Sequence, residues 1–571
     1  MKNRIAAVLM SICVAASMCA CGSETAQPAQ TAQEDASDEA ESGTETTQEQ
    51  SVSLTDAEEA AADDTAAEAD TLAQEDADLS DVRPSVSLMR FNKYEDKDMT
   101  TIASCSYDAP ALIEEAAIAY PQLNKTLTTD SDAIAAQYEK SFDEIEEAAE
   151  SAYDNMEGDA EDFPSGEIEG TMEVVRCDTS VLSLLDTTYI YYPGSAHGMT
   201  GFDGYNYDTA SGNPIELSDV FADMKAMETA IADNLVSTAT GEKVPVEDSM
   251  LEFAFEDAYE NLNWVIDRES VRFLFGPSDV APYALGTVEA RLYFDEHPEL
   301  FTGKYGTASG SYVQKLNPYE LYAVDLDGDG SKETLSVNGI EEETDSYYHT
   351  GLEVHVGEEA YTQEVEFYDF SAYLFHTEDG GNYVYAITGS DNDYQTLTVF
   401  AIKDKVVSTV GQMEGTGAGV SFVTMVDDDG EFDAEKSFSE WFPFTDPAHF
   451  ALATRMQLMS SCSAMRYYEV GSDGMPVPQT EQYQIRNGIE LTSLVELKAE
   501  EVDEMTGALT GKEVDLPVGS KCTFYGTNGS DTVDLRMEDG TIVRFHVDGN
   551  FPQTVNGVNL EEAFDGVVFA G

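Results

Sequence analysis

Basic residues are scarce in this sequence. The 571 residues include 28 lysines and arginines against 112 aspartates and glutamates, which gives a net charge of −84. Because like charges repel, this excess argues against nucleic acid and anionic lipid headgroups as partners. Cationic proteins, cationic peptides and divalent metal ions are the partners that the charge favours. An acidic surface that only keeps a secreted protein soluble is the plainer alternative.

Long apolar runs and familiar catalytic motifs are also missing. Beyond residue 21, no segment approaches the roughly 18 uninterrupted apolar residues that a membrane-spanning helix needs. The sequence has no GxSxG, SxxK or HExxH motif and no phosphate-binding loop. It has no CxxC motif or Cys/His cluster either, so a structural zinc site is not expected.

The N-terminus has the pattern of a bacterial lipoprotein leader. Lys2 and Arg4 precede an apolar stretch at 5–18, which is the length of a secretory signal. The following residues resemble a lipoprotein cleavage box with Cys21 as the lipidated residue; Cys19 is a rival position, and an ordinary secretory signal is the alternative. We predict a lipoprotein signal peptide at 1–21 and a protein anchored by lipid at the extracellular face of the cytoplasmic membrane.

Four further cysteines are candidates for disulfide bonds: Cys105, Cys177, Cys462 and Cys522. Secreted proteins fold where disulfides are permitted. Two cysteines fall in each half of the chain, so Cys105–Cys177 and Cys462–Cys522 are the simplest pairings. Free thiols in an anaerobic host are the alternative.

Composition divides the rest of the chain into four parts. Residues 22–84 contain almost no aromatic side chains and cannot offset the entropy of folding, which predicts a disordered acidic tether. Strand and helix patterns mingle in 85–305 without βαβ regularity, which predicts an α+β fold with an antiparallel sheet. Residues 312–510 favour a β-rich domain, and 511–571 favour C-terminal strands or a small barrel.

Periodicity predicts the elements within these parts. Apolar residues at helical spacing from Ile134 to Tyr153 predict a helix that Asp130 or Ser131 would cap. Three more helices are expected at 219–236, 250–262 and 447–460. Strands are expected at 166–176, 181–192, 321–325, 334–338, 351–356, 383–388, 396–402 and 406–412.

The first folded part is organised around residues 191–221. An aromatic strand at 187–192 enters a loop of small residues, in which tight backbone turns are possible: Gly194, Ser195, Ala196, His197 and Gly198. A strand at 204–208 and a short return strand at 214–217 follow, and Ser218 is expected to cap the next helix. We regard the loop as a possible ligand-binding loop. A His197 satisfied by backbone hydrogen bonds is the plainer interpretation.

These motifs resemble a known family. The pattern Gly-x-Ala-His-Gly, then Asn-Tyr-Asp-x-x-x-Gly at 206–212, then Ile-x-Leu-x-Asp-x-Phe at 215–221 is similar to an extracellular bacterial domain of unassigned chemistry. That domain occurs in the lysozyme-sensing anti-sigma factor of Gram-positive bacteria and ahead of the catalytic module of a peptidoglycan deacetylase. Segments 280–286 and 118–123 resemble its closing strands and its N-terminal companion module, although Ser195 replaces a glycine of the family. The resemblance implies binding of a lysozyme-like cationic protein or peptidoglycan.

A second motif predicts a metal site. Oxygen-bearing side chains alternate along an acidic loop with Gly328 and Gly330 at the bends: Asp325, Asp327, Asp329, Ser331 and Glu333. This spacing can wrap a hard cation the size of Ca²⁺. Flanking strand patterns make it resemble the strand-loop-strand calcium turns of integrin-like repeat proteins. We predict structural Ca²⁺ here, with a metal-free Asx turn as the alternative.

The sequence therefore favours a cell-surface lipoprotein that binds an envelope ligand and does not catalyse a reaction. Its partner would be a cationic protein such as lysozyme, or cell-wall glycan, and it would contact the membrane through its lipid only. The alternative is a peptidoglycan-modifying hydrolase or deacetylase with an unrecognised site around His197.

Overall fold

The computed structural model describes residues 82–571 apart from 157–159, 161–162, 239, 246–250, 252, 256–258, 260, 309, 343–344, 392–393, 427–431, 486–488, 505 and 570–571. The predicted signal peptide, its Cys21 and nearly all of the predicted tether lie outside the described residues. None of the helices in the described ranges is both long enough and apolar enough to cross a membrane.

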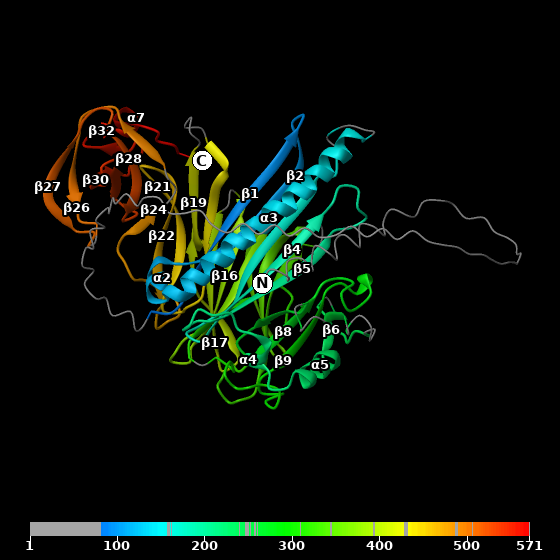
Figure 1. Ribbon diagram of the computed structural model, residues 1–571. Helices are drawn as coiled ribbons and strands as arrows, with labels where there is room; N and C mark the ends of the chain where they lie inside the picture. Colours follow the sequence, from blue (N-terminus) through cyan, green and yellow to red (C-terminus); the bar gives the residue numbers. More distant parts are fainter. Residues whose placement is uncertain are drawn as a thin grey trace, which may run out of the picture. The chain divides into compact units, whose positions relative to one another are not determined.

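The described chain is mainly β-structure, so the prediction of an α+β fold is wrong (Figure 1). Strands account for 52% of the structure and helices for 15%. One physical reason is that several segments expected to be helical are short or extended. Residues 447–460 were expected to form a helix, but most of them form the strand Phe450–Leu458, because their buried and exposed side chains partly alternate.

The first sheet begins with five strands: β1 (Val86–Lys97), β2 (Thr100–Leu112), β3 (Gly166–Cys177), β4 (Val181–Tyr191) and β5 (Met199–Asp208). Neighbours are antiparallel except for the parallel pair β2–β3. The antiparallel β3–β4 pair confirms the strands predicted at 166–176 and 181–192.

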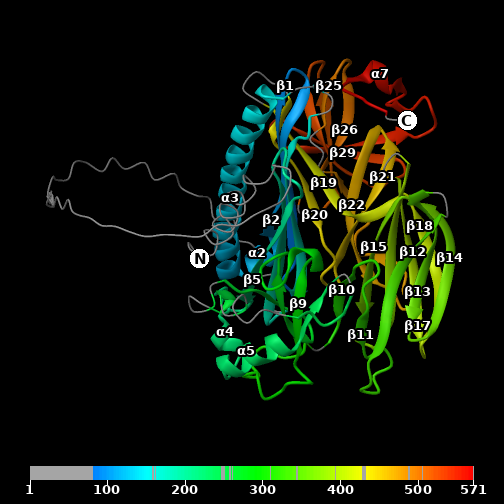
Figure 2. The ribbon, with the colours of Figure 1, turned by 90° about the vertical axis from the view of Figure 1, so that its right-hand side faces the viewer.

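Helix α3 (Pro121–Asp154) packs on one face of this sheet, and the short α2 (Glu114–Ala119) precedes it (Figure 2). The helix begins at Pro121, because proline suits the first helical position. The predicted caps Asp130 and Ser131 therefore lie inside the helix, where Asp130 accepts a hydrogen bond from the Tyr207 hydroxyl at 2.8 Å.

The other face of this sheet remains partly open to solvent. Asp186 and Thr188 of β4 point toward α3, since both bond to the Tyr138 hydroxyl, at 2.9 and 2.7 Å. Side chains alternate along a strand, so Tyr189 and Tyr191 point away from the helix. We call the part of this side formed by Glu167, Glu169, Thr171, Tyr189 and Tyr191 the open face; all of these are exposed except the half-buried Tyr191.

A second, four-stranded antiparallel sheet follows, in the order β6 (Leu235–Ser237), β9 (Val288–Tyr293), β8 (Ser270–Phe275) and β7 (Asn263–Ile266). The helix predicted at 219–236 is two helices, α4 (Leu217–Val220) and α5 (Met224–Asp233). The break occurs because Asp223 starts a new helix by accepting the backbone N–H groups of Lys225 and Ala226. Glu216, not Ser218, caps α4. Six of the 13 residues of the helix expected at 250–262 lie outside the described residues.

Two further sheets enclose one apolar core. The five-stranded sheet has the order β10 (Tyr312–Leu316), β15 (Asp369–His376), β16 (Asn382–Ser390), β17 (Tyr394–Lys403) and β18 (Val406–Glu414). The four-stranded sheet has the order β11 (Tyr322–Val324), β12 (Glu333–Glu342), β13 (Asp345–Val356) and β14 (Glu359–Phe367). Alternating apolar residues from both sheets meet in the core, which confirms the strands predicted between 321 and 412.

The remaining strands continue the first sheet, because β1 pairs with β20 as well as with β2. They enclose a separate apolar core near the C-terminus. They are β19 (Thr416–Val426), β20 (Phe432–Phe442), β21 (Phe450–Leu458), β22 (Ser460–Val470), β23 (Pro476–Pro478), β24 (Tyr483–Ile485), β25 (Glu490–Ser493), β26 (Leu497–Val502), β27 (Leu509–Leu516), β28 (Lys521–Thr527), β29 (Thr532–Met537), β30 (Ile542–Asp548), β31 (Thr554–Val555), β32 (Val558–Asn559) and β33 (Phe564–Asp565), with α7 (Leu560–Ala563).

Candidate functional site

The loop predicted to bind a ligand connects β4 to β5 and is exposed from Gly194 to His197. Gly194 has a φ of 81°, which favours glycine. Tyr191 donates its hydroxyl hydrogen to the Ser195 carbonyl at 3.3 Å. At Gly198, a Cβ atom would lie 2.3 Å from the Tyr189 ring, so glycine is needed for this ring to pack against the loop.

His197 joins the loop to the turn η4 (Tyr283–Leu285). Its ring stacks on that of Tyr283, with centroids 4.0 Å apart and planes 27° apart. The Gly198 carbonyl lies 3.0 Å from Nδ1 of His197 and accepts a hydrogen bond from the Tyr283 hydroxyl at 3.2 Å. We call Tyr189, Tyr191, His197 and Tyr283 the aromatic cluster.

The aromatic cluster borders an exposed carboxylate. Glu167 of β3 lies directly opposite Tyr191 of β4, so the two side chains share the open face. Partial burial, together with the nearby Glu167, Tyr283 and Tyr191, raises the pKa of Tyr189. The Tyr189 phenol therefore stays protonated and neutral near pH 7. Tyr189 and Tyr283 nevertheless remain 37% and 41% exposed.

The partners of His197 in the described chain are an aromatic ring and a backbone carbonyl. Across the described chain, no aspartate or glutamate lies within ion-pair distance of His197, which a general base would need as an orienting partner. Aromatic faces beside a carboxylate can instead hold cations or stack on sugars. Sequence reasoning singled out the loop but missed Glu167, Tyr189 and Tyr283 as part of the same surface. The alternation in β4 could have placed Tyr189 beside Tyr191, but no sequence signal brings Tyr283 there.

The predicted metal loop lies between β11 and β12, as its flanking strand patterns indicated. Carboxylate oxygens of Asp325, Asp327 and Glu333 lie within 4.8 Å of one another. The Asp325 carboxylate accepts the backbone N–H groups of Gly328 and Gly330, at 2.8 and 2.9 Å.

A hydrogen bond within the loop and ion pairs with Lys405 also stabilise the predicted metal loop. Asp329 accepts the backbone N–H of Ser331 at 2.7 Å, and this bond lowers the pKa of Asp329. The ammonium of Lys405 lies 3.2 Å from Asp327 and 2.8 Å from Glu333, and hydrogen bonds to these two carboxylates raise the pKa of Lys405. The backbone of the loop therefore turns so that three of its carboxylates converge, and two of them form ion pairs with the Lys405 ammonium.

The four cysteines are free thiols in the structure, so neither Cys105–Cys177 nor Cys462–Cys522 is bonded there. Cys105, Cys462 and Cys522 are buried and Cys177 is half-buried. Burial raises the pKa of Cys105 and of Cys522 to about 12, so both thiols are protonated near neutral pH.

The segment from α4 to the end of β9, which supplies Tyr283, matches a described family. Residues 218–295 match DUF3298, a family of proteins of unknown function. A DUF3298 family structure from Bacteroides fragilis NCTC 9343 is similar at 13% identity and a TM-score of 0.30, covering 39% of this chain and 94% of that chain. Another, from Pseudomonas aeruginosa PAO1, is similar at 14% identity and a TM-score of 0.27, covering 40% and 100%. The comparison with curated proteins gave no match.

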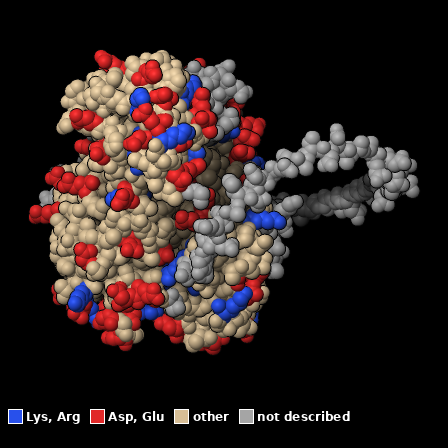
Figure 3. Space-filling model, turned by 90° about the vertical axis from the view of Figure 1, so that its left-hand side faces the viewer, with Lys and Arg blue, Asp and Glu red and all other residues tan. Residues whose placement is uncertain are grey.

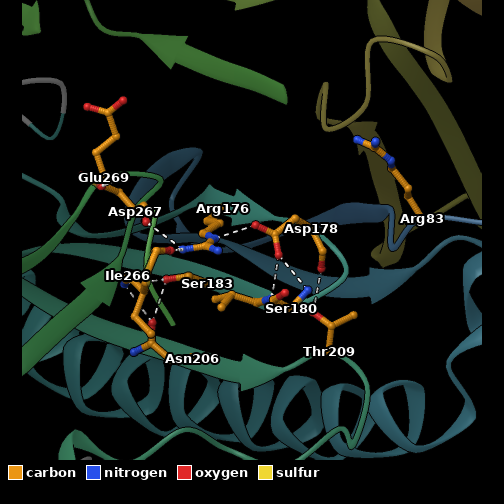
Figure 4. Close-up of polar contacts among 12 residues, drawn as sticks. Arg83, Arg176, Asp178, Ser180, Ser183, Asn206, Thr209, Ile266, Asp267 and Glu269 are labelled. Atoms are coloured by element: carbon orange, nitrogen blue, oxygen red, sulfur yellow. Dashed lines mark hydrogen bonds and ion pairs between the residues drawn. The ribbon is translucent and has the colours of Figure 1, made fainter. Parts of the chain in front are cut away.

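A polar junction binds the DUF3298 segment to the first sheet (Figure 4). Asn206 of β5 donates to the Trp264 carbonyl at 2.9 Å, and its side-chain oxygen accepts the Ile266 N–H at 3.1 Å. Ser183 of β4 accepts the same N–H at 3.1 Å. The Asn-Tyr-Asp motif therefore secures the strand β7 of the DUF3298 segment, and its asparagine has a structural role.

A buried arginine completes this junction. The guanidinium of Arg176 donates to Asp178 at 2.6 Å and to the carbonyls of Asp267 and Gly306, at 3.3 and 3.0 Å (Figure 4). Asp178 in turn accepts the backbone N–H groups of Ser180 and Val181. These bonds fix the segment that carries Tyr283 relative to the sheet that carries Tyr189.

Proposed function

We propose that this protein is a lipid-anchored, extracellular binding protein that holds a cationic envelope ligand and does not transform it. The aromatic cluster beside Glu167 is the observation that carries the proposal, because its exposed rings and carboxylate suit a cationic surface. The net charge of −84 supports the same partner. Acidic side chains also outnumber basic ones on the face in Figure 3, where a cationic protein would be attracted from a distance.

The ligand we propose first is a lysozyme-like cationic protein, with cell-wall glycan as the second. The resemblance of 191–221 to the lysozyme-sensing anti-sigma factor supports the first. Exposed tyrosines, which can stack on sugars, support the second. A hydrolase or deacetylase at His197 has less support, because the histidine has no acidic partner within the described residues.

Binding to lysozyme should be measurable with the full-length protein and should weaken with salt. We expect the affinity to fall about tenfold or more between 50 and 300 mM salt, since screening reduces attraction between opposite charges. Surface plasmon resonance on the immobilised protein would measure it, with pull-down by purified peptidoglycan as the second arm. No binding to lysozyme and no retention by peptidoglycan would refute the proposed function, and turnover of muropeptides that His197→Ala abolishes would establish the enzymatic alternative.

We also propose that the loop from Asp325 to Glu333 binds structural Ca²⁺. The convergence of three carboxylates supports this, and Ca²⁺ would displace the Lys405 ammonium from Asp327 and Glu333. Calcium at about a hundred times its Kd should raise Tm by about 2–4 °C or more. Asp327→Asn should abolish the shift, whereas Lys405→Met should allow it at lower calcium because the competing charge is gone. Differential scanning calorimetry with EDTA as the reference tests this, and an equal shift in Asp327→Asn would contradict it.

A further inference from the structure

Several tyrosines of this protein hold one of its own cations together with a carboxylate. The Lys332 ammonium lies 4.8 Å from the ring centroid of Tyr293 and 3.0 Å from Glu269. Lys97 lies 5.7 Å from the ring centroid of Tyr153 and 2.7 Å from Asp154. In both places the ring and the carboxylate share one charge, as expected for cation–π contacts beside an ion pair.

The same combination recurs elsewhere in the chain. The guanidinium carbon of Arg536 lies 4.7 Å from the ring centroid of Tyr525, and its Nη2 lies 2.7 Å from Glu504. Several of the 28 basic residues of the chain therefore each contact a tyrosine ring and a carboxylate together.

The aromatic cluster has the ring and the carboxylate but lacks the cation. Within the described ranges, no lysine or arginine lies over the ring of Tyr189 or Tyr191, and no basic side chain forms an ion pair with Glu167. The neighbouring Glu169 differs, because Arg90 already lies 3.2 Å from it. Arg90 also donates to Asp108 and to the Ser106 hydroxyl.

From this contrast we infer that Glu167, Tyr189 and Tyr191 form a subsite for one lysine or arginine side chain of the ligand. The ligand's cation takes the position that Lys332 takes at Tyr293, between a tyrosine ring and a carboxylate. Tyr283 borders the subsite, because its hydroxyl donates to the carbonyl of Gly198, the residue that packs against the Tyr189 ring. His197 covers one face of Tyr283. This inference rests on the proposed function, because it names the part of a cationic ligand that the aromatic cluster recognises.

A short cationic peptide tests the subsite by itself, because it lacks the other contacts that a whole protein ligand would make. The full-length protein is titrated with acetylated hexa-arginine amide and, as a neutral match of nearly the same shape, with the hexa-citrulline peptide. Tyr189→Ala and Glu167→Gln should each weaken hexa-arginine binding about threefold to tenfold, and Tyr189→Phe, which keeps the ring, should bind nearly as the wild type does. Tyr394→Ala and Glu359→Gln serve as controls, because both residues are exposed on other elements.

Each outcome decides between the two proposals. Equal binding of the citrulline peptide, or unchanged hexa-arginine binding in Tyr189→Ala and Glu167→Gln, overturns the subsite. If lysozyme binds all variants alike, the subsite is wrong and the proposed function stands. If hexa-arginine binding depends on Tyr189 and Glu167 but neither lysozyme nor peptidoglycan binds, the subsite stands and the proposed ligands are wrong. Far-UV circular dichroism of each variant confirms that it is folded.

Discussion

Gly204→Ala should destabilise the protein by about 3 kcal/mol or more, because the added methyl group has no space. Gly204 lies in β5, where this strand crosses β7 of the DUF3298 segment. A Cβ atom at this position would lie 2.0 Å from the carbonyl oxygen and 2.8 Å from the carbonyl carbon of Trp264. Those atoms are backbone and cannot rotate away as a side chain could, so the two sheets would have to separate.

Separation of the sheets would also break the hydrogen bonds of the polar junction. Asn206 donates to the same Trp264 carbonyl, so a shift of β7 would leave a buried amide and a buried carbonyl without partners. Urea unfolding followed by circular dichroism measures the loss. Gly306→Ala is the matched control, because nothing lies within 4 Å of a Cβ atom there. An unfolding midpoint for Gly204→Ala that equals that of Gly306→Ala would show that the two sheets do not approach this closely.

Glu289→Gln should cost about 3 kcal/mol at pH 7 and much less near pH 2–3. Glu289 is buried in β9, with Arg272 at 2.9 Å and Arg291 at 2.8 Å. Arg272 and Arg291 lie directly opposite each other on β8 and β9, so the glutamate charge separates two like charges. Glutamine would keep the shape but remove the nearest counter-charge of two largely buried guanidinium groups.

The pH dependence follows from the pKa of Glu289. Burial alone would raise this pKa, but the two arginines outweigh burial and lower it from 4.5 to about 2. The folded state therefore binds this proton less readily than the unfolded state, so the stabilisation is complete above pH 4.5 and is lost as the pH falls toward 2. The difference of about 2.5 pKa units corresponds to about 3 kcal/mol.

The measurement compares the free energies of unfolding of wild type and Glu289→Gln at pH 7 and pH 3. Glu296→Gln, at an exposed position beyond the same strand, controls for the loss of one charge and should change stability by less than about 0.5 kcal/mol. A cost for Glu289→Gln that stays constant between the two pH values would contradict the proposed ion cluster.

Local patterns predicted much of the β-structure but placed the helices poorly. The strands between 321 and 412 were found because one side of each sheet is buried and alternation is then visible in the sequence. The start of α3 was missed because Asp130 looks like a cap, whereas its carboxyl actually binds Tyr207 of β5. That contact joins residues far apart in the chain, so no local rule could reveal it.

The candidate site shows the same division. The glycine-rich loop around His197 and the acidic loop from Asp325 to Glu333 are visible in the sequence, because each depends on closely spaced residues and tight turns. The partners of the first loop are not visible, because Glu167 reaches Tyr191 through strand register and Tyr283 reaches His197 through the packing of two sheets.

The sequence by itself determined the acidity of the protein, the alternation of most of its strands and the two loops, since composition and short-range spacing suffice for these. Tertiary structure alone decided that an exposed carboxylate and three tyrosines would lie together, with no basic side chain of the described residues paired to that carboxylate. The physical reason is that such a surface depends on strand register and sheet packing, which are set by burial across the whole fold.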